Sequence, residues 1–178
     1  EGPGFMYRKD IADELGLKFE TLDDLDAAFA AVKEAYPDMT VCSFNCAHKF
    51  NWLLQQMGMA NNGYVETADG TLQWWLEQEG LLDYYKKINE WYRNGYISAE
   101  NFAYQSEDET KEVCVGGKVF ANFGYDNHAD NYNTAIAVNG DDFRFQLVTN
   151  ELSDDCKQFN TSCGGRGLYI TKSCEDVE

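Results

Sequence analysis

The chain alternates between segments in which apolar residues recur at helical spacing and short apolar runs typical of strands. Between Leu22 and Val32 the apolar residues fall on one face of a helix, with Thr21 as its N-cap and Pro37 beyond its end. Residues 39–44, MTVCSF, form a short run typical of a buried strand, and residues 47–58 follow as a second helix that ends at Gly58. This part of the pattern predicts a helix, a strand and a helix.

The middle of the chain predicts a hairpin followed by a long helix. Asp69 and Gly70 stand between β-prone flanks, which indicates a two-residue hairpin turn. Residues 76–95 have helical periodicity and end at Gly95, a residue typical of a C-cap. We interpret the apolar stripe of this helix as core packing. It comprises Leu81, Tyr84, Tyr85, Ile88, Trp91 and Tyr92.

The last third predicts a short helix over residues 108–117 and three strands, at 118–124, within 143–149 and at 167–171. A long polar loop from Glu151 to Gly165 separates the last two strands, and we interpret it as a domain junction. Because strands and helices alternate along the chain, the fold class is expected to be α/β, with strands and helices packed in layers.

Charge excludes some classes of partner. The 178 residues carry a formal net charge of −17, from 31 acidic and 14 basic residues, and Lys and Arg form no cluster. Such a chain repels phosphate backbones and anionic lipid, so we expect no nucleic acid partner. No apolar run reaches the roughly 18 to 20 residues needed to span a bilayer. The first residues, EGPGF, lack an initiator Met and signal-peptide features, so we expect the chain to begin inside a longer precursor.

Metal and cofactor chemistry find little support in the sequence. The spacing of the six cysteines does not match a zinc site, and no cofactor motif is present; the cysteines are Cys42, Cys46, Cys114, Cys156, Cys163 and Cys174. A disulfide between Cys156 and Cys163 and free thiols remain alternatives.

Catalytic signatures are also missing. The two histidines, His48 and His128, belong to no local HExxH or GxSxG motif, and GGRG at residues 164–167 lacks the Lys-Ser/Thr of a phosphate-binding loop. We therefore expect no enzyme. The many carboxylates leave a glycosidase-like pair open, because such a pair is defined by its separation in space.

Polar and aromatic residues gather where two predicted strands end. In open α/β sheets, ligands bind in the crevice outside the carboxyl ends of the strands. Aromatic rings combined with amide and carboxylate groups suit a small-molecule ligand there, although Asn127 and Asp130 capping the next helix is the alternative interpretation. The candidate ligand-binding residues are Phe44, Asn45, His48, Trp52, Tyr125, Asp126 and Asn127.

Four segments occur in the order found in one known family. They are FMYRKDIADELGLKFETLDDLDAAF, LLDYYKKINEWYRNGYISAENF, VGGKVFANFGYDNHADN and GLYITKSCEDVE. Together they resemble the family-1 extracellular solute-binding proteins, the ligand receptors of bacterial ABC importers, and especially their lipoprotein, sugar-binding-like branch. The proline that usually precedes the first long helix of the family is replaced here by Phe19 and Glu20.

The resemblance implies one lobe of a type II periplasmic-binding-protein-like fold, a mixed sheet flanked by helices, with a hinge crossing segment. Residues 1–150 are expected to form the second lobe, and residues 151–178 the crossing and the start of the return to a first lobe. The implied ligand is a carbohydrate, most naturally an oligosaccharide, with peptides as an alternative, and Tyr125, Asp126 and Asn127 fall where the family contacts its ligand.

The same resemblance implies a monomeric receptor that delivers its ligand to an importer permease. It places the full-length precursor outside the cytoplasm, on the cell surface or in the periplasm, with a lipid anchor. A carbohydrate-active hydrolase domain and a surface protein-interaction module are the alternative functions.

Overall fold

The computed structural model describes residues 2–47, 49–61, 63–67 and 69–156. The elements, in chain order, are β1 (Pro3–Arg8), α1 (Lys9–Leu15), α2 (Leu22–Ala35), β2 (Thr40–Phe44), α3 (Asn51–Gln56), β3 (Tyr64–Glu66), β4 (Leu72–Trp74), η1 (Trp75–Glu77), α4 (Leu81–Arg93), η2 (Ala99–Ala103), α5 (Glu107–Val115), β5 (Val119–Tyr125), α6 (His128–Asn139) and β6 (Phe145–Leu147).

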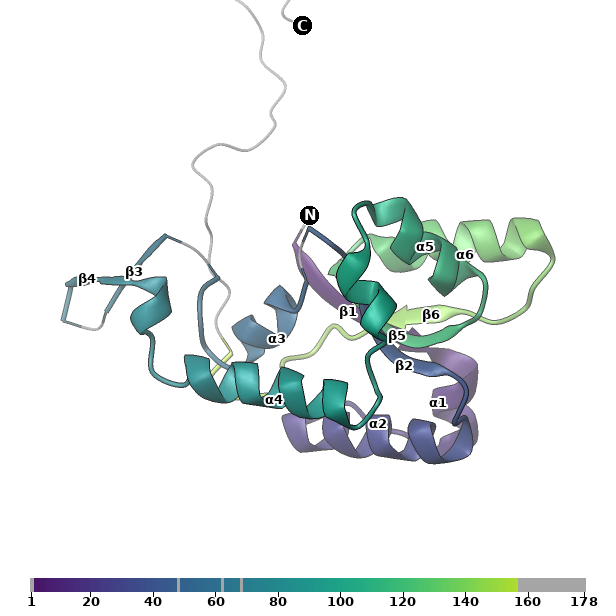
Figure 1. Ribbon diagram of the computed structural model, residues 1–178, viewed down its shortest axis with the longest axis horizontal. Helices are drawn as coiled ribbons and strands as arrows, with labels where there is room; N and C mark the ends of the chain where they lie inside the picture. The colour runs from purple at the N-terminus through teal and green to yellow at the C-terminus, as the bar shows by residue number, and fades with distance from the viewer. Residues whose placement is uncertain (1, 48, 62, 68, 157–178) are drawn as a thin grey trace, which may run out of the picture.

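A mixed four-stranded sheet organises the fold, with strand order β2-β5-β1-β6. β2 and β5 are parallel, whereas β1 runs antiparallel to both β5 and β6. In Figure 1 the sheet lies between α1 and α2 on one side and α5 and α6 on the other. The α/β class predicted from the sequence is confirmed, and so is the mixed sheet flanked by helices.

Helix α2 shows how a local signal sets an element. The Thr21 hydroxyl accepts a hydrogen bond from Asp24 N (3.1 Å), and the Asp24 carboxylate accepts one from Thr21 N (2.9 Å). This capping box satisfies backbone donors that the first turn leaves without partners. Leu25, Phe29 and Val32 are buried on one face, as predicted. The sequence of this helix therefore predicts both the residue at which it begins and the face that is buried.

Aromatic rings fill the side of the sheet that faces α2 and α4. Phe5 lies 4.7 Å from Phe123 and Phe29 lies 4.9 Å from Trp91, measured between ring centroids. The indole N–H of Trp91 donates to the Asp26 carboxylate at 2.8 Å, so the polar atom of this buried ring has a partner. These rings form the larger of the two core clusters.

The other side of the sheet has a smaller core under α5 and α6. Met6, Tyr132 and Phe145 belong to it, together with the fully buried thiol of Cys114. Polar groups lie beside it: Asn122 Nδ2 donates to Ser43 Oγ at 2.7 Å. This bond satisfies the Asn122 amide N–H, whereas Asn122 Oδ1 is buried without a hydrogen-bond partner among the described residues.

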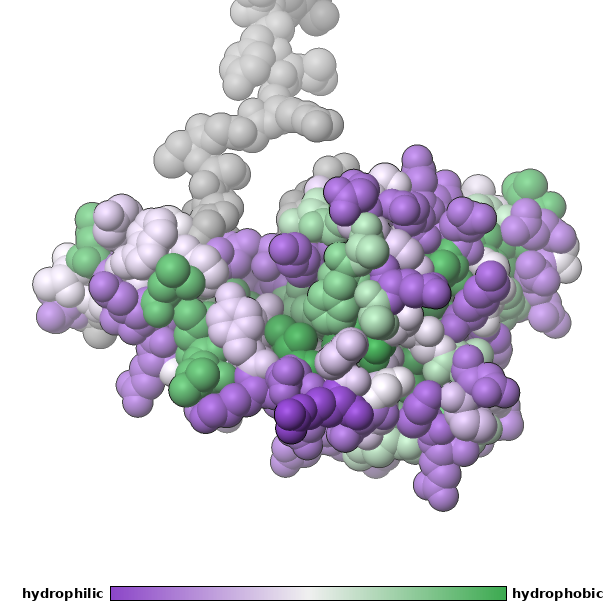
Figure 2. Space-filling view, viewed as in Figure 1, coloured by the Kyte–Doolittle hydropathy of each residue, from purple (hydrophilic) through white to green (hydrophobic). Residues whose placement is uncertain are grey.

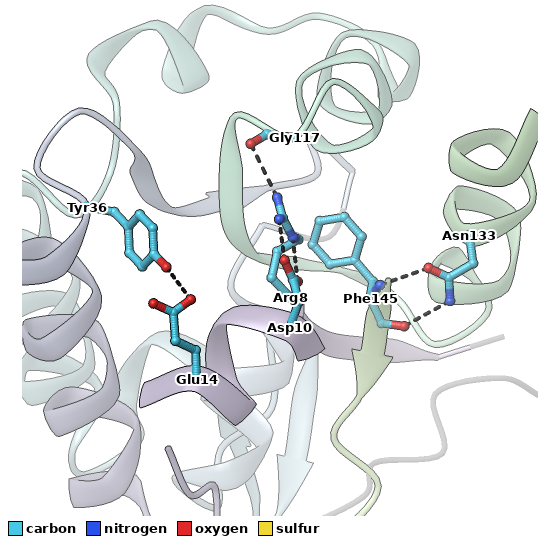
Figure 3. A network of polar contacts seen from close by, with 7 residues as sticks. All are labelled: Arg8, Asp10, Glu14, Tyr36, Gly117, Asn133 and Phe145. Atoms are coloured by element: carbon cyan, nitrogen blue, oxygen red, sulfur yellow. Dashed lines mark hydrogen bonds and ion pairs between the residues drawn. The ribbon is translucent and has the colours of Figure 1, made fainter. Parts of the chain in front are cut away.

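Charged and polar contacts fix the end of the sheet opposite the strand-end loops (Figure 3). The Arg8 guanidinium donates to the Asp10 carboxylate at 2.8 Å and to the Gly117 carbonyl at 3.4 Å. The Asn133 amide makes two hydrogen bonds to the backbone of Phe145, each of 2.8 Å, and so continues the pattern of a strand ladder. This network ties α6 to β6 and the loop before β5 to β1.

Three predicted elements differ in detail. The hairpin forms, but its strands end at Glu66 and resume at Leu72, so the connection is longer than the expected two-residue turn. Helix α4 begins at Leu81 because Gly80, with φ +87°, turns the chain before it. Helix α3 begins only at Asn51. The predicted strand at 167–171, the GGRG turn and most of the polar loop lie outside the described residues.

The interpretation of the α4 stripe as core packing is correct for only part of it. Leu81, Tyr84 and Trp91 are buried, but Tyr85 is 49% exposed and Tyr92 44% exposed. A helix that touches the body along one narrow line buries only the residues on that line. The two tyrosines are the flanks of the stripe and face outward.

Candidate functional site

The loops that follow β2 and β5 leave the sheet at the same edge. The two strands are parallel neighbours in which Phe44 is paired with Phe123, and Asn45 N donates to the Phe123 carbonyl at 2.8 Å. Because parallel strands end on one side of a sheet, the two predicted polar segments meet. This juxtaposition was expected from the sequence and is present.

The beginning of the chain meets the loop after β5. Pro3 is paired with Tyr125 across the antiparallel β1–β5 ladder. Beyond it, Gly2 N donates to the Asp126 carboxylate at 3.1 Å, and Asp126 N donates to the Gly2 carbonyl at 2.9 Å. Asp126 therefore links the first described residues of the chain to the loop after β5.

The candidate residues after β5 are accessible. Tyr125 is half-buried, with its ring centroid 5.0 Å from that of His128, while Asp126 and Asn127 are exposed. Asn127 occupies the N-cap position of α6, but its side chain makes no capping hydrogen bond. The interpretation of Asn127 as a mere helix cap is therefore not supported.

The candidates after β2 are mostly buried. Phe44 is 4% exposed and its ring packs 4.8 Å from Phe50; Trp52 is 6% exposed and its ring stacks 5.1 Å from Phe5. Asn45 is fully buried, and its Oδ1 accepts from Ala47 N at 2.8 Å. Phe44 and Trp52 therefore belong chiefly to the core and can offer only an edge to a ligand. His48 lies outside the described residues.

A cavity of about 390 Å³ opens beside these loops. We call it the strand-end cavity. Its lining mixes apolar side chains, those of Pro3, Trp52, Leu147 and Val148, with amides, one hydroxyl and the carboxylates of Asp126 and Glu151. Of the candidate residues, Trp52 and Asp126 are among its described lining residues. Such a lining suits a ligand rich in hydroxyl groups. The residues around the cavity are Gly2, Pro3, Gly4, Trp52, Gln55, Gln56, Asp126, Leu147, Val148, Thr149, Asn150, Glu151 and Cys156.

Several walls of the strand-end cavity are held by specific contacts. Gln56 is buried and its Oε1 accepts from Leu152 N at 2.7 Å, and Asn150 Nδ2 donates to the Phe19 carbonyl at 2.9 Å. At Gly4 an added Cβ would lie 2.8 Å from Asp126 Cα. Only glycine permits so close an approach of the two backbones.

Sequence reasoning missed the segment 147–151 and the amides of α3. The segment reaches the cavity because β6 pairs with β1, an arrangement that joins residues about as far apart as the described chain allows. A local signal for it exists: polar Thr149 ends the strand predicted within residues 143–149, and Asn150 directly follows it. That position is the same signal that singled out the other two loops.

Thiol and metal chemistry have little basis in the described part of the chain. Burial raises the pKa of Cys42 and raises that of Cys114 to about 12, so both thiols stay protonated at neutral pH. Cys46 and Cys156 are also free thiols, while Cys163 and Cys174 lie outside the described residues. Within the described ranges, no group of three or more His, Cys, Asp or Glu residues is placed to hold a metal ion.

The helices of the described chain are all too short or too polar to cross a membrane.

Comparison with solved structures gives consistent matches. Over 88% of this chain, alginate-binding protein AlgQ2 superposes with a TM-score of 0.65 at 19% identity. The substrate-binding protein FusA of an S. pneumoniae ABC transporter, in complex with kestose, matches 82% of the chain with a TM-score of 0.65 at 21% identity. The chain shares the fold of part of these binding proteins.

Other matches have the same character. An extracellular solute-binding protein from Staphylococcus aureus, in complex with maltose, covers 83% of the chain with a TM-score of 0.56 at 14% identity. The chain spans 34% of AlgQ2, 30% of FusA and 36% of the S. aureus protein, so it corresponds to about a third of each. No protein-family model matches the sequence, and a comparison with curated proteins finds no match.

Proposed function

We propose that the chain is the ligand-binding lobe of an extracytoplasmic solute-binding protein that delivers a carbohydrate to an ABC importer permease. One observation carries the proposal: the segments that follow β2 and β5 meet beside a cavity whose lining combines the Trp52 ring and the Asp126 carboxylate with the amides of Gln55, Gln56 and Asn150. The matched structures support it, because FusA and the S. aureus protein were each solved with a sugar.

The division of the chain follows from the same cavity. We propose that residues 1–150 form one lobe and that residues 151–178 cross a hinge to another. The strand-end cavity is lined by Gly2, Pro3 and Gly4, at the start of the described chain, and by residues 147–151, close to its end. A second lobe connected through these segments would cover the cavity, as in proteins that close on a ligand by hinge motion.

The proposed ligand is an oligosaccharide. Sugars have apolar C–H faces and a rim of hydroxyls, so the Tyr125 ring offers a stacking surface while Asp126 and Asn127 accept and donate hydrogen bonds. A volume of about 390 Å³ falls in the range of about 300–1,000 Å³ that is usual for ligand pockets. Peptides are the alternative ligand class.

A thermal-shift screen tests the ligand class. We expect neutral oligosaccharides to raise the melting temperature of the protein by mass action, and Asp126→Ala to reduce that shift. Because this chain supplies only one wall of the proposed clamp, millimolar ligand is needed. Stabilisation by peptides alone, or by no sugar in a broad panel, contradicts the proposal.

The proposed role is binding without chemistry. After prolonged incubation with the protein, we expect the oligosaccharide to be recovered with its chain length unchanged in chromatography. Release of shorter sugars, abolished by Asp126→Asn or Glu151→Gln, would instead identify a hydrolase.

One observation favours a protein-interaction module as a second candidate function. The β3–β4 hairpin extends away from the body in Figure 1, and its Tyr64 and Leu72 are 69% and 70% exposed. Exposed apolar side chains on one projecting element are typical of a contact surface. Sedimentation separates the candidates: a receptor lobe stays monomeric at rising concentration, whereas association that Leu72→Ser abolishes favours the module.

A further inference from the structure

A second hollow is lined by the loop after β2 and by Asn51 and Leu54 of α3. It has a volume of about 450 Å³ and lies between that loop, α4 and η2. We call it the aromatic groove. Buried Phe44 and Phe50 form part of its floor, while Tyr85 and Phe102 are 49% and 54% exposed. Aromatic faces that remain open to solvent are suited to stacking on a sugar ring.

The aromatic groove continues along α4. An adjoining hollow of about 440 Å³ shares Tyr85, Ile88 and Phe102 with it and adds Asn89 and Tyr92. Tyr92 meets Phe102 edge to face, with ring centroids 5.6 Å apart. The exposed rings that the sequence pattern assigned to the core therefore belong to one continuous surface.

Two amide side chains hold the walls of the groove in place. Buried Asn101 accepts from Phe44 N at 2.7 Å and donates to the Phe44 carbonyl at 2.9 Å, which sets the neighbouring Phe102 ring 5.0 Å from the Phe44 ring. Gln78 similarly accepts from Ala60 N at 2.9 Å and donates to the Trp75 carbonyl at 2.8 Å. These hydrogen bonds hold the walls of the groove in position in the absence of a ligand.

The charge of the groove is unlike that of the chain. The sequence has 31 acidic residues, yet among the described residues no carboxylate lines either hollow, and the one charged side chain there is Lys49. Asn51 and Asn61 supply amides beside it. In the described part of the chain, no carboxylate pairs with the Lys49 ammonium. An anionic group entering the groove therefore meets the Lys49 ammonium, with no carboxylate among the described lining residues beside it.

Lys49 also has an unusual backbone. Its φ of +46° makes it the one non-glycine residue of the described ranges in the left-handed region. Residues with a side chain rarely adopt this conformation, and where they do, the strain is often kept at a functional surface. The strain and the isolated charge are independent observations on the same residue.

We infer that the aromatic groove is a second carbohydrate-binding surface and that it selects saccharides bearing a carboxylate. A sugar ring stacks on Tyr85 or Phe102 while its carboxylate meets the Lys49 ammonium. The inference rests on the proposed function and deepens it: the ligand class is then acidic oligosaccharides, for which the groove is a binding surface separate from the strand-end cavity.

Two matched probes test this selectivity. Trigalacturonate and its neutral methyl ester have the same rings and linkages and differ in charge. In a residue-resolved NMR titration we expect trigalacturonate to shift the amides of Lys49, Tyr85 and Phe102 and to bind three- to tenfold more tightly than the ester. Equal affinity for the two probes overturns the selectivity.

The location of the shifts separates this inference from the proposed function. Shifts confined to the amides of Tyr125–Asn127 overturn the inference about the groove and leave the proposal for the strand-end cavity supported. Shifts confined to the groove support the inference and count against the strand-end cavity. No shift with either probe overturns the groove, and the neutral-sugar screen then decides the proposed function.

Variants with matched controls complete the test. Lys49→Gln is expected to abolish the preference for the acid, whereas Lys118→Gln, an exposed lysine at the opposite end of the sheet, keeps it. Phe102→Ala should weaken both probes at least threefold, and the exposed hairpin ring removed by Tyr64→Ala should have no effect. Lys49→Gly relieves the left-handed strain, so it should lose the preference while its melting temperature stays unchanged or rises. Retained preference in Lys49→Gly overturns the inference.

Discussion

The strand-end cavity and the aromatic groove lie along the same helix, α3, but their linings differ: Trp52, Gln55 and Gln56 of α3 line the cavity, whereas Asn51 and Leu54 line the groove. The cavity is lined by the carboxylates of Asp126 and Glu151 and by amides, together with apolar side chains such as Trp52 and Val148. The groove is lined by rings, amides and one lysine. Figure 2 shows a surface that is mostly hydrophilic, with hydrophobic residues exposed over the hairpin, the start of α4, the centre of the view and its upper right.

The difference shows that two surfaces next to each other can have separate origins. The strand-end cavity follows from topology, because parallel strands and the two ends of the lobe meet at one edge of the sheet. The groove follows from tertiary packing, because α4 and η2 pack beside the loop and leave Tyr85, Tyr92 and Phe102 partly exposed. Perturbing one surface should therefore leave the other intact.

The largest expected effect comes from Asn101→Ala, which breaks the groove. The change removes two hydrogen bonds and leaves the buried backbone of Phe44 short of partners, which should cost about 2–3 kcal/mol in the free energy of unfolding. Urea unfolding measures it. Gln105→Ala, an exposed amide change nearby, serves as the control and should stay within about 0.5 kcal/mol. Equal losses in the two variants would show that Asn101 does not hold η2.

Gly4→Ala should instead distort the wall of the strand-end cavity. Its Cβ would meet Asp126 Cα at 2.8 Å, so the backbone must move, at an expected cost of about 1–3 kcal/mol in unfolding free energy. Gly2→Ala is the matched control, because a Cβ there meets only the Asp126 carboxylate at 3.8 Å. Amide shifts in Gly4→Ala should concentrate at Tyr125–Asn127 and spare Phe102. Shifts that reach Phe102 would contradict the independence of the two surfaces.

Asp126→Ala should have a smaller effect, because its hydrogen bond to Gly2 N is exposed. We expect a loss of about 0.5–1 kcal/mol in unfolding free energy and faster hydrogen exchange at the Gly2 amide. Asp130→Ala, an exposed carboxylate change on α6, is the control. Unchanged exchange at Gly2 in Asp126→Ala would mean that Asp126 does not tie the chain entry to the loop.

The smallest effect concerns pH and the hairpin. Hydrogen bonds from the Thr67 and Thr71 hydroxyls lower the pKa of Asp69 from 3.8 to about 2. A lowered pKa stabilises the hairpin at pH values above the ordinary pKa, and this stabilisation is lost as the pH falls through about 2. NMR signals of Tyr64 and Trp74 should therefore change between about pH 4 and pH 2, and Thr67→Val should move that change to higher pH. A midpoint near 3.8 in the unchanged protein would contradict the Thr67 contact.

Much of the fold could be predicted because its signals are local. The capping box at Thr21 and Asp24 and the spacing of Leu25, Phe29 and Val32 identify α2 from sequence alone. The meeting of the loops after β2 and β5 followed from a general rule for α/β sheets, and Asp126 and Asn127 are exposed at that edge. Their role as ligand contacts stays a prediction.

The rest depended on contacts between distant segments. An aromatic residue after a strand looks the same in sequence whether it faces a ligand or the core, and Phe44 and Trp52 turned out to be largely buried. Tyr85 and Tyr92 have helical spacing equal to that of buried Tyr84 and Trp91, and only the line of contact of α4 separates them. The left-handed backbone of Lys49 has no sequence signal at all.

The central claim is that the segments following β2 and β5 form one carbohydrate-binding surface. A residue-resolved NMR titration with maltotriose, a neutral oligosaccharide, tests it most directly. The account predicts that the amides of Asn45, Tyr125, Asp126 and Asn127 shift together along one binding curve, joined by Gly4 and Thr149 of the cavity wall. Shifts confined to the Tyr64–Trp74 hairpin, or a saturating sugar concentration that leaves the strand-end amides unmoved, would contradict it.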